Sequence, residues 1–525
     1  MDTIEDGNID NNIIKVNKNK GLYVEEYIEE NGINYFTGRN NLRELKKSLK
    51  NIKNKDFILP TNINANLRTY QKEGYYWMKS LDYLGFGGIL GDEMGLGKTL
   101  QTITFLASNP ESKSLIIAPT SLIYNWYSEF KKFAPDINIK LVNGDRLDRE
   151  YILNNNKYDV LITTYNLLRR DIELYSKYEF TYCILDEAQN IKNAASLNAK
   201  ATKLINAKCK FALTGTPIEN SLMELWSIFD FIMPGFLYDE KRFTTRYHRR
   251  LEEDDCIIDE LNSLIRPFIL RRYKKDVIKE LPDKIEKKLV IPMTKEQLEV
   301  YDTYNKHVKS IIEKKVKDQE FNTSRIEILS YITKLRQIAL DPSVVMEGYN
   351  GTSGKLEALL ETVKLGIEEG HKILVFSQFT SVLKNIAVEF ENNKITYNYL
   401  DGSVSSKDRM KLVEEFNNSE TSVFLISLKA GGTGLNLTSA DIVIHFDPWW
   451  NPAVEDQATD RAHRIGQKNI VEVIKMVSEG TVEEKILMLQ EEKKNLIKKV
   501  IDEENRNIDI ISSLNEDEIL NLLMR

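Results

Sequence analysis

Two sets of short apolar runs divide the chain, one between residues 87 and 213 and the other between residues 373 and 476. The runs of the first set end in Gly, Thr, Asp or Pro, and stretches with helical periodicity separate them. This alternation is typical of a parallel β-sheet covered by helices. It predicts strands at 87–90, 115–118, 160–163, 182–185 and 210–213, and again at 373–376, 396–400, 423–427, 442–446 and 471–476.

The stretches outside these two sets have a different pattern of polar and apolar residues. Residues 218–347 form long, charged helical patterns with few strand candidates, and the first sixty residues are polar, with one amphipathic pattern at 42–52. We therefore predict an α/β fold with two parallel-sheet lobes and inserted helical protrusions. The expected parts are a polar lead-in segment (1–60), the first lobe (61–235), helical protrusions with a linker (236–352), the second lobe (353–480), and C-terminal brace helices with an acidic tail (481–525).

Composition narrows the class of protein. A chain of 525 residues is too long for one core, and 42% hydrophobic with 29% charged residues is ordinary for a soluble globular protein. The three cysteines share no CxxC spacing, so neither a disulfide framework nor a zinc site is expected. The longest apolar runs are too short for a bilayer, and acidic residues open the chain where a signal sequence would carry cations. We expect a cytoplasmic protein with no membrane partner.

The clearest candidate chemistry is a glycine-rich loop, Gly91-Asp-Glu-Met-Gly-Leu-Gly-Lys-Thr99, between an apolar run and a helical pattern. Backbone N–H groups at a helix N-terminus bind phosphate oxygens, and glycines such as Gly95 and Gly97 let the chain approach closely. Lys98 would reach the β- and γ-phosphates of ATP, and the Thr99 hydroxyl would bind Mg²⁺. Asp92 stands where the general phosphate-loop pattern requires Gly. On this loop alone, an ordinary turn before a helix is an alternative.

Two adjacent carboxylates, Asp186 and Glu187, follow the predicted strand at 182–185. Such a pair taken alone is usually a charge pair at a helix N-terminus. Combined with the loop, it indicates a nucleoside triphosphatase, in which Asp186 holds Mg²⁺ through water and Glu187 activates the attacking water.

Other short motifs follow one another from residue 67 to near the end of the chain. In the first half they are Leu67-Arg-Thr-Tyr-Gln71-Lys-Glu-Gly74, the loop above, Ala118-Pro-Thr-Ser-Leu-Ile-Tyr-Asn-Trp126, Thr163-Thr-Tyr165, Asp186-Glu-Ala-Gln189, Leu213-Thr-Gly-Thr-Pro-Ile-Glu-Asn220 and Leu335-Arg-Gln-Ile338. In the second half they are Val375-Phe-Ser-Gln-Phe379, Leu400-Asp-Gly402, Lys429-Ala-Gly-Gly-Thr-Gly-Leu-Asn436, Asp447-Pro-Trp-Trp-Asn-Pro452 and Gln457-Ala-Thr-Asp-Arg-Ala-His-Arg-Ile-Gly-Gln467. This series resembles the Swi/Snf family of superfamily-two helicase-like ATPases, of the short bacterial or viral type. The family carries Asp at position 92, whereas Gln189 stands where many members have His.

The resemblance implies two RecA-like lobes and several nucleotide contacts. Gln71 would contact adenine, since a carboxamide can both donate and accept a hydrogen bond. Arg461 and Arg464 would act as arginine fingers from the second lobe, with Gln457 as their helper. The two arginines are three residues apart and would share one face if helical; without the family they could equally be surface arginines.

Nucleic-acid contacts are expected in loops at strand ends, where hydroxyls and backbone N–H groups can bind phosphates without reading bases. Each could also be an ordinary turn. Trp449 and Trp450 could stack on bases, but packing is the better interpretation of their position. The basic stretch 271–275 could follow a duplex backbone or brace the lobes. The loop residues proposed for DNA contact are Pro119, Thr120, Ser121, Thr163, Thr164, Ser377, Gln378, Gly431, Gly432 and Thr433.

The sequence thus favours a DNA-stimulated ATPase that uses ATP and Mg²⁺, translocates on double-stranded DNA, and displaces or remodels an unidentified DNA-bound protein without separating the strands. In a bacterium it would be associated with the nucleoid. Two alternatives stay open: a strand-separating helicase, and a nucleic-acid-binding scaffold without turnover. Against the scaffold stands the intact set of catalytic residues, which comprises Lys98, Thr99, Asp186, Glu187, Arg461 and Arg464. The sequence does not indicate the displaced protein, the pathway or the oligomeric state.

Overall fold

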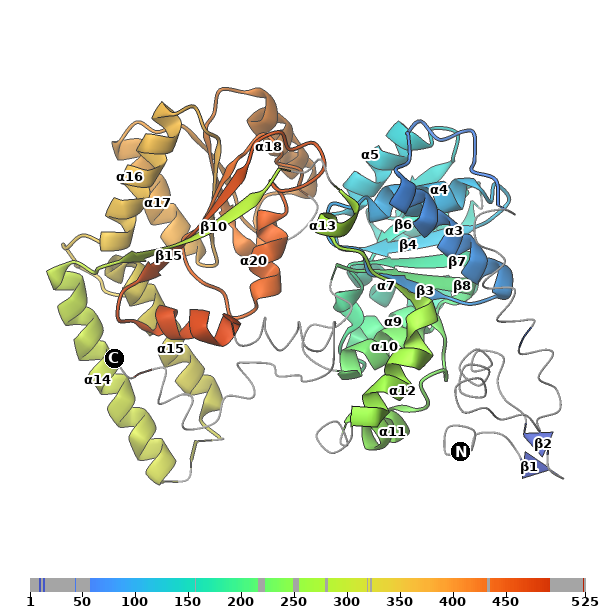
Figure 1. Cartoon of the computed structure of the whole chain (residues 1–525), viewed down its shortest axis with the longest axis horizontal. Coiled ribbons are helices and arrows are strands. Elements are labelled where there is room, and N and C mark those ends of the chain that lie inside the picture. Colours follow the sequence, from blue (N-terminus) through green and yellow to red (C-terminus); the bar gives the residue numbers. More distant parts are fainter. Residues whose placement is uncertain are drawn as a thin grey trace. The chain divides into compact units, whose positions relative to one another are not determined.

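The computed structural model consists of two compact units, and the chain passes from one to the other between Val277 and Ile278 (Figure 1). The amphipathic pattern at 42–52 and most of the predicted C-terminal part (481–525) lie outside the residues that the structure describes. Those residues are 57–155, 157–215, 222–248, 255–278, 282–318, 320–321, 323–431 and 435–491, together with 9, 10, 13, 14, 43 and 523.

The first unit is built on a seven-stranded, entirely parallel sheet with the strand order β5-β6-β4-β7-β8-β3-β9. Every residue of β3, β4 and β6 is buried, as expected for a parallel sheet covered on both faces. Five of its strands confirm the predicted apolar runs, whereas β5 and β9 were not predicted. The strands are β3 (Gly88–Leu90), β4 (Ser114–Ala118), β5 (Ile139–Leu141), β6 (Val160–Thr164), β7 (Glu179–Asp186), β8 (Asn206–Leu213) and β9 (Ile269–Leu270).

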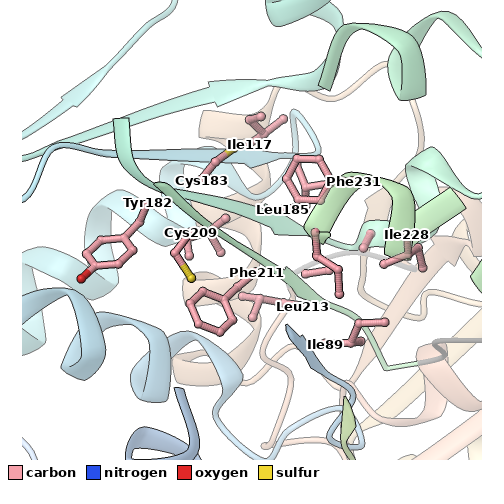
Figure 2. Packing of buried hydrophobic residues seen from close by; sticks show 14 of the residues in the cluster. Ile89, Ile117, Tyr182, Cys183, Leu185, Cys209, Phe211, Leu213, Ile228 and Phe231 are labelled. Carbon is pink, nitrogen blue, oxygen red and sulfur yellow. The ribbon is translucent and has the colours of Figure 1, made fainter. Parts of the chain in front are cut away.

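Helices α3, α4 and α5 cover one face of this sheet, and α7, α9 and α10 cover the other (Figure 1). Figure 2 shows side chains of β7 and β8 with Ile228 and Phe231 of α10 in the buried core. The free thiols Cys183 and Cys209 lie within this core. The helices are α3 (Thr69–Leu84), α4 (Lys98–Ala107), α5 (Ile123–Phe133), α6 (Arg146–Asn154), α7 (Tyr165–Arg170), α8 (Ile172–Tyr175), α9 (Leu197–Lys203), α10 (Leu222–Ile232), α11 (Glu240–Phe243), α12 (Asp255–Ile265) and α13 (Lys274–Val277).

The second unit has a six-stranded parallel sheet with the order β10-β15-β14-β11-β13-β12. Five strands confirm the predicted runs: β11 (Ile373–Ser377), β12 (Tyr397–Leu400), β13 (Val423–Ser427), β14 (Ile442–His445) and β15 (Val471–Ser478). The sixth, β10 (Lys284–Ile291), pairs with β15 in the register Lys284↔Val471.

Two strands that we did not predict, β9 and β10, lie within the largely helical region 218–347. Strand β10 reads Lys-Ile-Glu-Lys-Lys-Leu-Val-Ile, and all its residues except Ile291 are exposed. A charged strand at a sheet edge leaves no apolar run for a sequence search to find. Strand β9 has only two residues, fewer than a pattern needs.

Long helices in the second unit do confirm the helical character of the inserted region. Helices α14 (Lys295–Lys317) and α15 (Arg325–Leu340) pack together in a cluster that includes Tyr301 and Ile332, and Trp450 is buried in the same cluster. Trp450 is therefore a packing residue, as favoured from its position. The remaining helices are α16 (Gly354–Glu368), α17 (Thr380–Asn392), α18 (Ser406–Asn418), α19 (Leu428–Gly431) and α20 (Pro452–Thr459), and residues 482–491 are also helical.

Short strands β1 (Ile9–Asp10) and β2 (Ile13–Ile14) pair antiparallel near the start of the chain. Among the residues described above, no helix combines the length and the apolar character that crossing a membrane would require.

Candidate nucleotide-binding site

The glycine-rich loop connects β3 to α4, and α4 begins at Lys98. Gly95 and Gly97 have left-handed backbone angles, with φ of 84° and 78°. A Cβ on Gly97 would also lie 2.6 Å from Nε2 of Gln71, so Gly97 is required both for its conformation and for this close approach. The Nζ atom of Lys98 donates to the main-chain oxygen of Asp92 at 2.6 Å. Its ammonium group is therefore held against the loop from which it would reach a phosphate.

Asp92, the residue that departs from the general phosphate-loop pattern, is completely buried. Its carboxylate accepts hydrogen bonds from Nε of Arg272 at 2.9 Å and from Nη2 at 2.5 Å. The side chain of Asp92 is thus bound by this arginine, and the predicted contact between Asp92 and a nucleotide stays a prediction. No local pattern identified Arg272 as the partner, because it follows Asp92 by 180 residues.

Gln71, the predicted adenine contact, lies in the first turn of α3 and is buried. Its Oε1 accepts from the backbone nitrogen of Arg68 at 3.0 Å, and its Nε2 donates to the main-chain oxygen of Leu96 at 3.2 Å. Gln101 of α4 donates to the same oxygen at 3.4 Å. Both carboxamides thus support the phosphate loop, and the contact between Gln71 and adenine stays a prediction.

The acidic pair lies where β7 ends. Nε1 of Trp126 donates to Oδ2 of Asp186 at 2.7 Å, and the hydroxyl of Tyr165 donates to the Asp186 main-chain oxygen at 2.8 Å. Burial, and next the charge of Glu187, raise the pKa of Asp186 to about 7, although the hydrogen bond from Trp126 and the charge of Lys98 act in the opposite direction. A cation at this carboxyl would favour its ionised form. The donor set therefore fits Mg²⁺ beside a nucleotide.

Glu187 has a left-handed backbone, with φ 49° and ψ 59°, which is unusual for a residue with a side chain. Nε2 of Gln189 donates to Oε2 of Glu187 at 2.8 Å, and the hydroxyl of Thr214 donates to Oε1 of Gln189 at 3.1 Å. The backbone nitrogen of Thr214 donates to the oxygen of Leu90 in β3 at 3.2 Å. Gln189, at the position where many relatives have His, therefore links the acidic pair to the ends of β8 and β3.

These contacts bring the predicted catalytic groups of the first unit together at the carboxyl ends of β3, β7 and β8, where parallel sheets bind their ligands. The side chains that sequence reasoning did not assign are Trp126, Gln101 and Arg272. Trp126 was part of a quoted motif, but nothing in its spacing indicated a partner 60 residues away.

The predicted arginine fingers belong to the second unit, and their local geometry differs from our expectation. Helix α20 contains Gln457 but ends at Thr459, so Arg461 and Arg464 lie on the turn after it and do not share a helix face. Arg461 is buried, and its main-chain oxygen accepts from Leu437 at 3.0 Å. Nη1 of Arg464 donates to the oxygen of Leu435 at 3.3 Å. Their contact with a γ-phosphate stays a prediction.

The residues predicted to contact DNA fall into two groups. Thr163, Thr164 and Ser377 are buried, and all three hydroxyls make hydrogen bonds within the protein; that of Thr163 donates to the main-chain oxygen of Val142 at 3.5 Å. The Thr164 hydroxyl caps α7 by accepting from Leu167 at 3.2 Å, and the Ser377 hydroxyl donates to Asp447 at 2.5 Å. These side chains support the loops from inside, and a contact of these loops with DNA stays a prediction.

Thr120 is exposed, whereas Pro119, Ser121 and Gln378 are partly exposed. Gly431 is buried, and a Cβ there would lie 2.6 Å from Phe376. Gly432 and Thr433 lie outside the described residues.

A buried polar network surrounds Asp447 in the second unit. Nη2 of Arg336 lies 3.7 Å from its Oδ2, and the backbone nitrogen of Gln378 donates to its Oδ1 at 3.2 Å. Burial raises the pKa of Asp447 to about 6, against the opposing charge of Arg336. Close by, Lys355 and Glu483 form a fully buried ion pair with 2.6 Å between Nζ and Oε2.

Three family models match parts of the chain. The SNF2-related domain matches residues 70–344, the helicase conserved C-terminal domain matches 354–466, and the bacterial SNF2 helicase associated domain matches 2–60. The last match covers the segment 1–60, which we had described from the sequence only as a polar lead-in.

An uncharacterized ATP-dependent helicase of Mycoplasma pneumoniae is 42% identical over 464 residues, which are 87% of this chain and 44% of that protein. A putative ATP-dependent helicase/translocase, YwqA of Bacillus subtilis, is 41% identical over 468 residues, 85% of this chain and 50% of that one. The chain thus spans about half the length of these relatives. The solved SWI2/SNF2 ATPase core of Sulfolobus solfataricus in complex with dsDNA is 38% identical, covers 90% of this chain and 99% of its own, and superposes with a TM-score of 0.44.

Proposed function

Because the chain belongs to the SNF2 family, whose SNF2-related domain matches residues 70–344, we propose that it is a DNA-stimulated ATPase that translocates on double-stranded DNA. In this proposal it displaces or remodels a DNA-bound protein and does not separate the strands. The observation that carries the proposal is the convergence of the phosphate loop, the acidic pair and Gln189 at the carboxyl ends of three neighbouring strands.

The first unit would bind the nucleotide through the N-terminus of α4. The backbone N–H groups of the loop and the ammonium group of Lys98 would hold the phosphates. Thr99 and Asp186 would hold Mg²⁺, which when bound neutralises charge on the phosphates. Trp126 and Tyr165 fix the position of Asp186, so this carboxylate is oriented before any ligand arrives.

Glu187 is the proposed general base. Its carboxylate would accept a proton from the water that attacks the γ-phosphate, and Gln189 would orient it. The backbone strain at Glu187 supports a functional position, since non-glycine residues in this region cluster at active sites. Arg461 and Arg464 of the second unit complete the proposal as the groups that stabilise the charge of the transition state.

Double-stranded DNA is the proposed nucleic-acid partner. The archaeal ATPase core of 38% identity was solved in complex with dsDNA, and the Bacillus relative bears the name of a putative helicase/translocase. Contacts through backbone groups and exposed hydroxyls such as that of Thr120 would grip phosphates without sequence preference. The strand-separating helicase is the second candidate, because both bacterial relatives carry the word helicase in their names.

One experiment separates these candidates. Phosphate release is measured with and without duplex DNA, and the same preparation is then given a DNA triplex and a forked duplex with ATP. We expect DNA-stimulated turnover, displacement of the third strand, and a fork that stays paired; Lys98→Ala should do none of these. Unwinding of the fork would favour the helicase, and turnover that ignores DNA would contradict the translocase.

A further inference from the structure

Arg272 follows β9 and binds three separate segments of the first unit. Besides its two hydrogen bonds to Asp92, its Nη2 donates to Oε1 of Gln101 at 2.9 Å and its Nη1 donates to the main-chain oxygen of Tyr70. Its side chain is only 11% exposed. A single guanidinium thus joins the phosphate loop, the helix that follows the loop, and α3, which carries Gln71.

The surroundings are shaped to admit this guanidinium. A Cβ on Gly74 would lie 2.9 Å from Nη2 of Arg272 and 1.8 Å from Oε1 of Gln101. Any side chain at position 74 would therefore displace the pair. The ring of Tyr70 lies beside the guanidinium, with 5.3 Å from its centroid to Cζ. The motif Leu67–Gly74 therefore ends in glycine because a larger residue would collide with Gln101 and Arg272.

The backbone of the same segment continues the connection. The nitrogen of Gly91 donates to the oxygen of Leu270 at 2.7 Å, and the nitrogen of Glu93 donates to the oxygen of Arg272 at 2.9 Å. The nitrogen of Lys274 donates to Oε2 of Glu93 at 2.7 Å. The loop is thus paired with the segment 270–274 on both sides of Asp92.

We propose that Arg272 is a positioning residue for nucleotide binding, which acts through Asp92 to hold the phosphate loop in its binding conformation. Asp92 replaces the usual glycine because its carboxylate gives the loop an anchor outside the nucleotide site. Arg272 touches no reacting atom in this role. The inference rests on the proposed function, because it concerns the same ATP site. The sequence left two roles open for the stretch that contains Arg272, a contact with duplex DNA and a brace between the lobes. The role proposed here differs from both.

A bidentate contact predicts how substitutions combine. Arg272→Gln and Asp92→Asn each remove the charged pair, so each should weaken the binding of a fluorescent ATP analogue by about 10-fold or more. The double variant should bind no more weakly than the weaker single variant. Lys275→Gln is the matched control: it removes an exposed cation from the same basic stretch and should leave the Kd unchanged.

The test measures the Kd of the analogue, KM and kcat for ATP, and thermal unfolding without nucleotide for the full chain and each variant. Because Lys98, Asp186 and Glu187 stay in place, we expect the KM to rise much more than the kcat falls. Arg272→Lys takes the place of Arg272→Gln if the latter does not fold. It keeps one positive charge and loses the two-pronged contact, so its Kd should also rise.

Two results would overturn the inference. One is an unchanged Kd and KM in the Arg272 variant, and the other is a double variant whose loss equals the product of the two single losses, because Arg272 would then act independently of Asp92. Failure of the proposed function has a different signature: the parent chain and Lys275→Gln would both fail to bind the ATP analogue.

Discussion

The indole nitrogen of Trp126 donates a hydrogen bond to the carboxylate of Asp186, 2.7 Å away, and so ties the motif that begins at Ala118 to the acidic pair at the end of β7. Trp126 is buried in the core, and Asp186 is partly buried, with its second oxygen, Oδ1, accepting from the backbone nitrogen of Glu187 at 2.9 Å. The orientation of the proposed magnesium ligand is thus set by an aromatic residue of α5.

Trp126→Phe should weaken the use of magnesium. The substitution removes the only indole donor to Asp186 that the described contacts contain, so the carboxylate loses its fixed orientation and a hydrogen bond that favours its ionised form. We expect the Mg²⁺ concentration for half-maximal ATP turnover to rise about 5- to 10-fold, in line with the loss of an outer contact to a metal ligand. Trp226→Phe, which removes a buried indole donor to the oxygen of Tyr238 at 3.2 Å, is the control and should leave this concentration unchanged. Equal effects of the two variants would contradict the link.

Lys98→Ala and Glu187→Gln should give different defects. Loss of Lys98 removes the cation that holds the phosphates, so both ATP binding and turnover should disappear. Glu187→Gln keeps the size of the side chain and removes the base, so ATP should still bind while hydrolysis falls by about 10²- to 10⁴-fold. Titration with a fluorescent ATP analogue and a phosphate-release assay measure the two properties separately. Parental turnover in Glu187→Gln would show that another group is the base.

Arg464→Ala should reduce DNA-stimulated turnover by about 10³-fold, as expected for an arginine finger, with little change in DNA affinity. Lys468→Ala removes an exposed cation four positions later and serves as the control. Turnover and DNA binding are measured on the same preparations. Normal turnover in Arg464→Ala would remove this residue from the proposed site.

Asp447 should make stability depend on pH. Its pKa is raised to about 6 in the folded chain, whereas an unfolded Asp titrates near about 4. Between these values the folded chain holds a proton that the unfolded chain has released, so the contribution of Asp447 to the free energy of unfolding falls as the pH rises. Relative to the parent, Asp447→Asn should therefore gain about 3 kcal/mol between pH 4 and pH 7.

Denaturant unfolding at several pH values measures this difference. Burial lowers the pKa of His445 to about 4, which has the opposite effect on stability, but His445 is present in both chains and cancels in the comparison. Asp401→Asn is the control: hydrogen bonds from Ser403 lower the pKa of Asp401, so this carboxyl is ionised in both the folded and the unfolded chain above about pH 4, and the stability difference from the parent should stay nearly constant over this range. A constant difference between parent and Asp447→Asn over this range would contradict the shift.

Lys355→Met should destabilise the second unit. The substitution leaves Glu483 as a buried charge without its partner, and such losses cost about 3–5 kcal/mol. The double variant Lys355→Met/Glu483→Leu removes both charges and should recover most of this loss. Lys364→Met on the same helix changes an exposed side chain and should stay within about 0.5 kcal/mol of the parent. A double variant less stable than the single one would show that the pair is not the cause.

The strands that could be predicted from the sequence are those whose apolar residues match their burial in the structure. Strands such as β4 and β13 are buried along their whole length and therefore appear as continuous apolar runs. Strand β10 was not predicted because it lies at an exposed edge of the sheet, where the side chains need not be apolar. Helix α20 ends before Arg461, and the residues 460–466 contain no glycine or proline early enough to mark this end.

The candidate site divides in the same way. Lys98, Asp186 and Glu187 could be predicted because the phosphate loop and the acidic pair each lie at the end of a predicted strand, and the carboxyl ends of parallel strands lie at one edge. The partners that hold these residues could not, because contacts such as those of Arg272 with Asp92 and Trp126 with Asp186 join segments that have no common sequence pattern. Asp92 alone carried a signal, since a carboxylate in place of a glycine needs a cationic partner once it is buried.

The pairing of β10 with β15 has a consequence for the order in which the protein is made. Residues 284–291 leave the ribosome long before residues 471–478, yet the register Lys284↔Val471 to Ile291↔Ser478 joins them directly. The sheet of the first unit needs nothing beyond Leu270, so that unit can complete its core while the rest is still being translated. The second sheet must wait for nearly the whole chain, and until then β10 is a nascent strand without its neighbour. Its lysines, at positions 284, 287 and 288, keep that waiting strand from associating with others.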